Sequence, residues 1–522
     1  MKRVRLIFGS ILFMGIVTSY AGDDYAKFNG WAFRNWEQDP VYRNVFQQAF
    51  IGVSSDDPMN GILYDEIYSK YATGGQCFGM SLLSVTILKE EGHLGFCKPI
   101  YIYSGDNTKP YTGPTDSLLR KAIMVMHAHQ FGHASVNWLL EAFKGEEFSN
   151  GKFAWEQADY YLSMGDPPLI SIIQGIDDGH TMVPYRCDKI GSSEWRIYVY
   201  DPNRPYKTDS AYYAGDSNYI KVKAIPGGYD WSFKTTSGDW SGTTGPPLPE
   251  GGIFIIPSSL VKPASRNPLA LGAVQDEIGT IILRSDGGSV AQIIDGKGRK
   301  FYKTDVDAHT KLSEIEDDPN LGMTNAIRWV NFGEAKGNYP EVYFIKGISG
   351  KDLKIDVASK GKDYKFLLAG RDNVVKVEAT SGPFGRDELE LQRVGTRHQE
   401  LKINSKRGAA TYSVELYRMI PITEAARTFK ISNLKVTKTS PVRLRLTGNR
   451  DALLIKSEKG PVVCDMEIIQ TVGGKISKLE KKNINVSGVK WQKVAPTNWT
   501  NLKDAKLELK EIEFKKVTER NK

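Results

Sequence analysis

The sequence predicts an α+β protein in which a domain of mixed helices and strands is followed by two β-sandwich-like domains. The chain has 522 residues. This is more than one hydrophobic core supports, since single cores stop growing near roughly 250–300 residues. Residues 23–257 combine apolar helical runs with short strand patterns, whereas the chain beyond Pro257 consists mainly of short runs typical of strands. Pro263 and Pro268 indicate a linker between the two regions.

We expect four segments along the chain. Residues 1–21 form a signal peptide, residues 22–260 the mixed domain, residues 268–421 the first β-sandwich-like domain and residues 424–522 the second. In antiparallel sheets of this kind one face of each strand is buried and the other faces water. The strand patterns are 280–283, 341–345, 353–357, 365–368 and 374–377 in the first β domain, and 430–436, 442–446, 453–456, 462–468 and 507–514 in the second.

The N-terminus has the pattern of a cleaved secretory signal. Basic residues precede an apolar run at 6–17, and the small residues Ser19 and Ala21 occupy the positions that a signal peptidase reads. The run is shorter than the roughly 20 residues of a spanning helix and is interrupted by glycine and serine, which argues against a retained anchor. We therefore expect cleavage after Ala21, a secreted or periplasmic protein, and no stable membrane insertion afterwards.

The formal charge of +8 is spread along the chain, because 69 Lys and Arg residues are interleaved with 61 Asp and Glu residues. A protein that binds nucleic acid needs a basic stripe and a recognisable module, and the sequence has neither. We expect no nucleic-acid partner. In the most basic stretch, 475–522, basic residues alternate with acidic ones, as on the solvent-exposed face of strands. This charge is compatible with association of the β domains with an anionic cell surface.

Four cysteines are too few for a disulfide scaffold, even in an exported protein. Cys464 lies in an apolar strand pattern and is expected in a core. Cys97 and Cys187 are either two thiols or one disulfide, since sequence does not fix connectivity. The remaining cysteine, Cys77, has a context of its own.

Cys77 stands at the expected start of a helix. It follows two glycines and Gln76, and a mainly apolar helical run occupies 81–89. The N–H groups at a helix N-terminus have no intrahelical acceptor, and together with the helix dipole they favour a thiolate over a thiol. A buried cysteine is more often inert. The assignment of Cys77 as a nucleophile therefore depends on its companions.

Two further motifs supply a base and an acid. A strand pattern at 169–173 precedes His180, and a second strand at 195–200 ends at Asp201. A hairpin whose loop is centred near Gly191 places His180 and Asp201 opposite each other, to within a residue of register. A base that takes the thiol proton and an acid that orients the base are the groups that activate a cysteine.

In this order, a cysteine that opens a helix, a strand that begins Gly-His and a strand that ends Asp-Pro resemble the papain-like cysteine peptidase superfamily, in particular the leader-cleaving peptidase domains of bacteriocin exporters. The resemblance covers roughly residues 23–257 and implies a papain-like fold there. It also implies cleavage of a peptide bond through a thioester acyl-enzyme. Cys77 would be the nucleophile, His180 the base and Asp201 the orienting acid, with no cofactor.

The chain departs from the superfamily at one position. Members carry an oxyanion-stabilising Gln before the cysteine, in the region where this chain has Lys70, Tyr71 and Ala72. Gln76 is the nearest amide and becomes the oxyanion candidate, with the backbone N–H of Cys77 as the second donor.

A cluster of three histidines suggests a metal site, but the surrounding sequence pattern does not support one. His129 and His133 would share a helical face, but His127 would not lie on it, and no carboxylate or cysteine pair accompanies them. We expect no metal site and an ordinary helix that lines the cleft.

The resulting hypothesis is a secreted cysteine hydrolase that acts on a peptide or protein. An acyltransferase with the same triad is one alternative, because it forms the same thioester and differs only in the nucleophile that resolves it. A catalytically inactive peptidase-like protein that binds or adheres through its β domains is the other. The presence of all three triad residues favours an enzyme, whereas the missing upstream Gln and the large share of β domains favour the binding protein.

Overall fold

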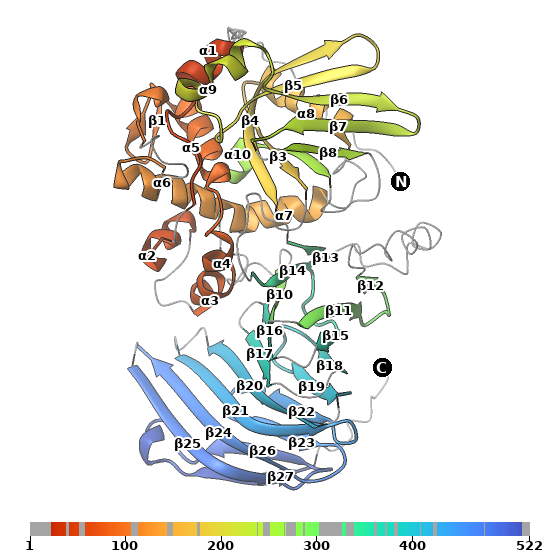
Figure 1. Ribbon diagram of the computed structural model, residues 1–522. Helices are drawn as coiled ribbons and strands as arrows, with labels where there is room; N and C mark the ends of the chain where they lie inside the picture. The colour runs from red at the N-terminus through yellow and green to blue at the C-terminus, as the bar shows by residue number, and fades with distance from the viewer. Residues whose placement is uncertain are drawn as a thin grey trace, which may run out of the picture.

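The computed structural model describes residues 22–37, 41–51, 58–105, 113–142, 150–174, 178–236, 238–243, 251–265, 267, 278–285, 288–301, 326–329, 339–359, 363–370, 373–380, 385–407, 409–420, 425–473 and 475–513. The predicted signal peptide lies outside these ranges. The described chain combines helices with many strands, which confirms the α+β class. Figure 1 shows two parts, one with helices around a sheet and one built of strands. None of the described helices has the length and apolarity needed to cross a membrane.

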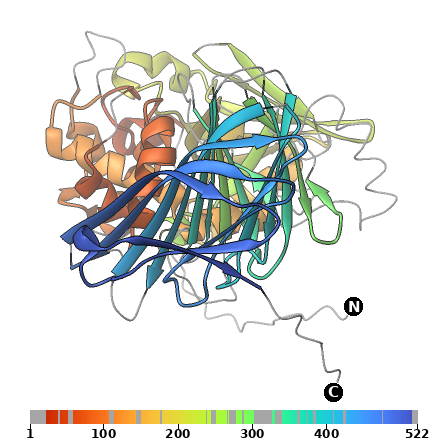
Figure 2. The ribbon, with the colours of Figure 1, turned by 90° about the horizontal axis from the view of Figure 1, so that it is seen from below.

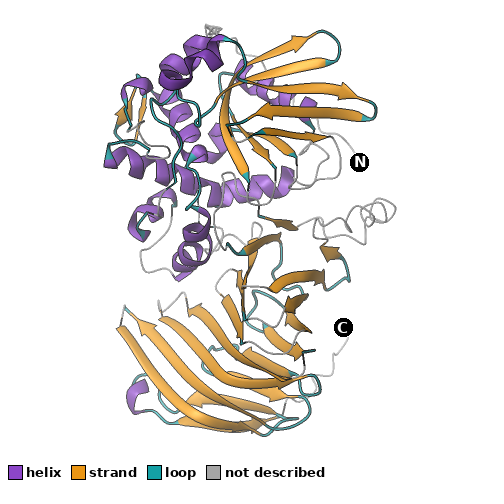
Figure 3. Cartoon of the chain, in the orientation of Figure 1, coloured by secondary structure: helices purple, strands orange, loops and turns teal. Residues whose placement is uncertain are grey.

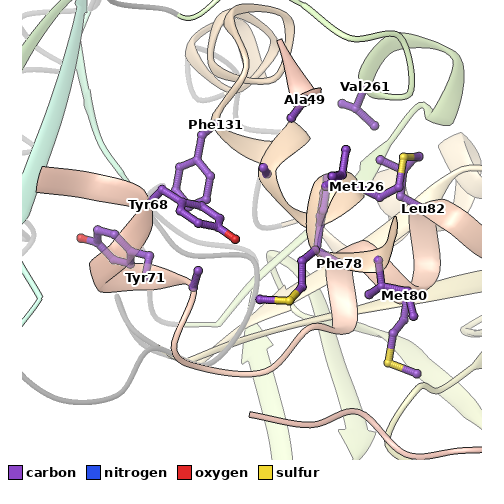
Figure 4. Close-up of a cluster of buried hydrophobic side chains, with 14 of the residues drawn as sticks. Ala49, Tyr68, Tyr71, Phe78, Met80, Leu82, Met126, Phe131 and Val261 are labelled. Atoms are coloured by element: carbon purple, nitrogen blue, oxygen red, sulfur yellow. The ribbon is translucent and has the colours of Figure 1, made fainter. Parts of the chain in front are cut away.

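The first part contains nearly all the helices (Figure 3). They are α1 (Gly22–Asn29), α2 (Arg43–Phe46), α3 (Pro58–Ile62), α4 (Ser69–Tyr71), α5 (Cys77–Glu90), α6 (Ser117–Ala128), α7 (His133–Ala142), α8 (Gly151–Ser163), α9 (Tyr206–Ala214) and α10 (Ser258–Val261). The central one is α5, in which every residue from Cys77 to Ile87 is buried. Figure 4 shows Phe78, Met80 and Leu82 of this helix among the apolar side chains of the surrounding core.

Seven antiparallel strands form the sheet of the first part, in the order β8-β7-β6-β5-β4-β3-β9. They are β3 (Leu169–Ile173), β4 (Gly179–Ile190), β5 (Glu194–Tyr200), β6 (Tyr219–Ile225), β7 (Gly228–Lys234), β8 (Asp239–Thr243) and β9 (Gly252–Ile256), and a separate short pair joins β1 (Gly92–His93) to β2 (Phe96–Cys97). Both β3 and β9 are buried throughout. One face of the sheet shares a core with α8 and the other with α5, so the sheet is covered on both sides.

The second part consists of two nine-stranded antiparallel sheets. The first large sheet contains, in spatial order, β13 (Ala326–Arg328), β14 (Glu341–Lys346), β10 (Ile278–Ser285), β16 (Tyr364–Gly370), β17 (Asn373–Ala379), β20 (Ala409–Ile420), β21 (Ala425–Thr437), β24 (Val462–Val472) and β25 (Lys475–Val486). The second large sheet contains β12 (Lys300–Phe301), β11 (Gly288–Asp295), β15 (Leu353–Ser359), β18 (Gly385–Gln392), β19 (Glu400–Ser405), β22 (Val442–Leu446), β23 (Leu453–Ser457), β26 (Trp491–Pro496) and β27 (Leu507–Ile512).

The strands of the two predicted β domains share both large sheets. The predicted boundary at 421–424 falls between β20 and β21, and these two strands pair with each other from Ala409↔Thr437 to Ile420↔Ala425. A single apolar core contains residues of both sheets from Ile281 to Leu507. Seen from below, the strands run across the molecule as continuous layers (Figure 2). The division into two domains stays a prediction, and the two halves are joined by strand pairing.

Each strand pattern predicted beyond residue 268 coincides with a strand, although β27 ends at Ile512. The expectation of one wet face holds for the distal strands, such as β22 and β26, whose residues alternate between buried and partly exposed. It is wrong for β10, β14, β16 and the start of β17, which are buried on both faces. Their uninterrupted apolar runs, such as 342–345, are the sequence signal for double burial.

The second face of these strands is covered by the helices of the first part. The ring of Trp329 lies 5.2 Å from that of Phe131 and 5.6 Å from that of Phe344, measured between centroids. All three side chains are fully buried and belong to the same core as α5. The Tyr71 hydroxyl donates a hydrogen bond to the carbonyl of Pro340, and Lys365 forms an ion pair with Glu66. The two parts therefore share one hydrophobic core.

This shared core predicts joint unfolding. Trp329→Ala should lower the free energy of unfolding by about 3–5 kcal/mol, because it empties a buried aromatic site. It should destabilise helices and strands in the same transition, followed by calorimetry and by circular dichroism at helix and strand wavelengths. Trp491→Ala is the matched control on partly exposed β26 and should cost far less. A Trp329→Ala protein in which the strand signal melts early while the helix signal is unchanged would contradict the shared core.

Candidate active site

Cys77 is the first residue of α5, as predicted, and is fully buried. A close crossing of α5 and α6 fixes this end of the helix: a Cβ at Gly79 would lie 2.2 Å from the carbonyl oxygen of Ile123. One turn into the helix, the Ser81 hydroxyl donates a hydrogen bond of 3.1 Å to the carbonyl of Thr181. This bond joins α5 to the residue that follows His180, and so holds Cys77 near His180.

His180 is the second residue of β4 and lies opposite Ile172 of β3. The strand is also linked to β3 through side chains, because the hydroxyls of Ser171 and Thr181 are 2.7 Å apart. The His180 side chain is almost completely buried. Its backbone position is therefore fixed by the sheet, and its ring by the groups that surround it.

Asp201 follows the last residue of β5, but the predicted hairpin register is wrong. The strands pair Ile190 with Glu194 and Val183 with Tyr200, with a bulge between Pro184 and Arg186. Extending the Val183↔Tyr200 register would place His180 opposite residue 203 rather than Asp201. The turn is centred one residue later than expected, which moves the residue opposite His180 by two positions, and the bulge reverses only one of them.

The two side chains meet because the chain turns sharply after β5. The N–H of Asn203 donates a 2.8 Å hydrogen bond to Oδ1 of Asp201, and the N–H of Arg204 donates to the Asp201 carbonyl at 2.9 Å. Such a side-chain-capped turn is common for Asp before Pro. It directs the carboxylate back toward β4, where Oδ1 lies 2.7 Å from Nε2 of His180.

The imidazole of His180 thus has two polar neighbours. Nε2 forms the hydrogen bond with Asp201, and the side chain of Cys77 forms a further hydrogen bond with the ring. The side chains of Cys77, His180 and Asp201 lie together, and their roles as nucleophile, base and acid stay a prediction. Asp201 is completely buried and its Oδ2 has no hydrogen-bond partner among the described residues.

The environment of His180 favours the charged ring. Burial alone lowers the pKa of an imidazole, since it penalises the cation. Here the charge and hydrogen bond of Asp201, together with the contact to Cys77, outweigh burial and raise the pKa of His180 to about 10. The imidazolium is therefore the dominant form at neutral pH.

A tyrosine that sequence reasoning missed supports Asp201. The N–H of Asp201 donates to the hydroxyl of Tyr213 at 3.3 Å, and this hydroxyl donates to the carbonyl of Arg204 at 2.7 Å. Tyr213 belongs to α9 and is buried. Burial and the charge of Asp201 hold its pKa well above the usual value, so it stays a neutral donor. No local motif marks it, because only the packing of α9 brings it to the turn.

Gln76, the predicted oxyanion donor, uses its amide within its own loop. Its Nε2 donates to the carbonyl oxygens of Ala72 at 3.0 Å and Gly74 at 3.4 Å. These two acceptors account for both amide hydrogens. The side chain is fully buried, and in this arrangement it shapes the turn before Cys77. An oxyanion role for Gln76 stays a prediction and would require the amide to give up these bonds.

Residues 30–37 connect the helix that carries Cys77 with the turn that carries Asp201. The Trp31 indole donates to the carbonyl of Met80 at 2.9 Å, and the Trp31 backbone N–H donates to the Tyr200 hydroxyl at 3.0 Å. Further on, the backbone N–H of Asn35 donates to the carbonyl of Pro202 at 2.8 Å. The segment therefore contacts both α5 and the turn that carries Asp201.

His127 of α6 and His129, which follows this helix, are buried. Burial lowers the pKa of His127 to about 3, so the ring is neutral, and its Nε2 lies 2.9 Å from the Gln130 amide. His129 Nδ1 lies 2.9 Å from the carbonyl of Val261. Within the described ranges, no three potential metal-ligating side chains gather at one point.

The other cysteines lie apart from the triad. Cys464 is buried in β24, as predicted. Cys97 is exposed and Cys187 is partly buried, and both are free thiols in the structure. Burial raises the pKa of Cys187, which makes it a poor nucleophile.

The raised pKa of His180 should be visible by NMR, which is tractable because the chain has seven histidines. The ring should stay protonated to pH 8 and titrate near pH 10, with His180→Gln identifying the signal. Since the folded value exceeds the unfolded one, the pair stabilises the fold fully below about pH 6.5 and ceases to do so above pH 10. In Asp201→Asn burial remains without the countercharge, so the pKa should fall below 6.5. An unchanged titration in this variant would contradict the coupling.

Comparison with protein-family models, with curated proteins and with solved structures gave no match for the chain. The function is therefore argued from the triad and from the elements that hold it.

Proposed function

We propose that this chain is an exported cysteine hydrolase that cleaves an amide bond in a peptide or protein through a thioester intermediate. The observation that carries the proposal is the buried 2.7 Å hydrogen bond between His180 and Asp201, with Cys77 as the second partner of the same ring. Cys77 also opens a helix, where the dipole favours a thiolate. Base, orienting acid and sulfur are the minimum set for nucleophilic catalysis by cysteine.

In the proposed reaction Sγ of Cys77 attacks the substrate carbonyl carbon, and the π electrons of the carbonyl move to its oxygen. When the tetrahedral intermediate collapses, the C–N bond breaks and His180 gives its proton to the departing amine. Water then attacks the thioester, neutral His180 takes a proton from it, and the thiolate leaves. Asp201 holds the ring in one orientation and stabilises the imidazolium, which is present before acylation and forms again when His180 takes the proton of water.

A papain-like fold for the first part belongs to the same proposal. Its support is the order of elements: the nucleophile opens a central helix, and base and acid follow on adjacent antiparallel strands packed beside it. Export is proposed from the N-terminal sequence, and association of the β part with a cell surface from its excess of lysine. Neither is needed for the chemistry.

The first test asks whether Cys77 is an activated thiol. At pH 6 ordinary thiols are almost entirely protonated, since their pKa is about 8.5. Iodoacetamide labelling with site mapping at pH 6 should therefore modify Cys77 at least about tenfold faster than exposed Cys97, and His180→Gln should abolish the difference. Cys77→Ala should remove the fast phase. If Cys77 labels no faster than buried Cys464, it is not the nucleophile.

The second test addresses Asp201, with cleavage of a peptide library as the readout. Asp201→Asn should fold and lose about 10²–10⁴-fold in kcat, because an amide orients the ring without stabilising its charge. Asp201→Ala should lose more. Asp178→Ala is the matched control on the acid closest to His180 in the described sequence, and should keep near wild-type turnover. Should Asp178→Ala alone abolish turnover, Asp201 is not the third member of the triad.

A further inference from the structure

Asn35 lies between the loop that carries Cys77 and the turn that carries Asp201. Its side-chain Oδ1 accepts a hydrogen bond from the backbone N–H of Gln76 at 2.5 Å, and its own backbone N–H donates to Pro202. Both bonds end one residue away from a member of the triad. The Asn35 side chain is thus held beside the N-terminus of α5 by its hydrogen bond with Gln76, the residue before Cys77.

The Asn35 amide packs directly on Gly75. A Cβ at Gly75 would lie 2.5 Å from Nδ2 of Asn35 and 3.3 Å from its Oδ1. Only a residue without a side chain leaves room for the amide here. Segment 30–37 also forms a bridge between Glu37 and Gly75, which keeps its backbone beside the loop. The position of the Asn35 amide thus explains why Gly75, the second of the two glycines before Cys77, carries no side chain.

The side-chain amides of Gln76 and Asn35 differ in whether their N–H groups already have hydrogen-bond acceptors. Both hydrogens of Gln76 Nε2 point to backbone carbonyls. Asn35 uses its oxygen for the loop, and no acceptor for its Nδ2 occurs within the described ranges. Asn35 is also partly exposed, whereas Gln76 is fully buried. Of the two, only Asn35 is an oriented amide with a donor left for a substrate.

We propose that Asn35 is a catalytic residue whose Nδ2 donates a hydrogen bond to the oxyanion of the tetrahedral intermediate, in place of Gln76. The inference rests on the proposed function, because an oxyanion forms only if Cys77 attacks a carbonyl. A preoriented donor of this kind acts mainly in the transition state, where the charge on oxygen develops. The N-terminal dipole of α5 adds to the same field.

The test compares two reactions of the same thiol. With p-nitrophenyl acetate, Sγ attacks the carbonyl, an oxyanion forms, p-nitrophenolate leaves with the bonding electron pair and an acetyl thioester remains. With iodoacetamide, Sγ displaces iodide at a saturated carbon and no oxyanion forms. The ratio of the acylation rate to the alkylation rate therefore isolates oxyanion stabilisation from thiol reactivity.

Asn35→Ala and Asn35→Asp should each lower this ratio by about 10²–10³-fold, the usual effect of removing one oxyanion donor. Asn35→Asp keeps an oxygen that can accept from Gln76, so a loss in both variants is not explained by a loosened loop. Gln76→Met is the matched control and should leave the ratio within about threefold of wild type.

Three results would overturn the inference. If both Asn35 variants lose acylation and alkylation in parallel, the residue only supports the loop. If Gln76→Met lowers the ratio and the Asn35 variants do not, Gln76 is the donor. If the wild-type protein is alkylated at Cys77 but is never acylated there, the proposed function itself fails, and that outcome is recognised before any Asn35 variant is measured.

Discussion

The buried contact between His180 and Asp201 is the interaction on which the first part of the molecule is organised. A carboxylate and an imidazolium removed from water cost several kcal/mol each unless their partners are supplied by the fold. The fold supplies this support from separate places: the turn after β5 gives the Asp201 carboxylate the N–H of Asn203, and α9 gives Tyr213, whose hydroxyl bonds the backbone of that turn. The sheet and α9 must be assembled before the pair is stable, which ties the chemistry to the tertiary structure.

The fold must also place Cys77 beside the His180–Asp201 pair, because Cys77 belongs to a different element, α5. The bond from Ser81 to the Thr181 carbonyl and the two bonds made by Trp31 fix α5 against the strands. Each of these groups is buried, so water does not compete for the bonds. The positions of sulfur and ring are thereby set by packing that involves neither of them directly.

The sequence predicts the triad because each member lies in a recognisable local context: a helix start for Cys77, and strand termini for His180 and Asp201. It fails where the outcome depends on distant residues. The hairpin register combines a turn centred one residue later than expected with a bulge between Pro184 and Arg186, and no short-range pattern predicts either. Asn35 and Tyr213 are likewise invisible, since only tertiary packing brings them to the site. For the β part, apolar periodicity locates many strands, whereas the pairing of β20 with β21 across the expected boundary is a non-local choice. Charged strands such as β25, most of whose residues are exposed, carry little apolar signal.

The core shared by helices and large sheets has a consequence for how the sequence can change over evolution. Trp329 contacts both Phe131 of the first part and Phe344 of the second, so a change in size at one of the three requires compensation at its neighbours. Strands β24 to β27 lie at the far end of the sheets from these contacts (Figure 1). We expect changes in these strands to leave the contacts of Cys77, His180 and Asp201 undisturbed. We therefore expect the first part and the near strands to change together, and the distal strands to tolerate more change.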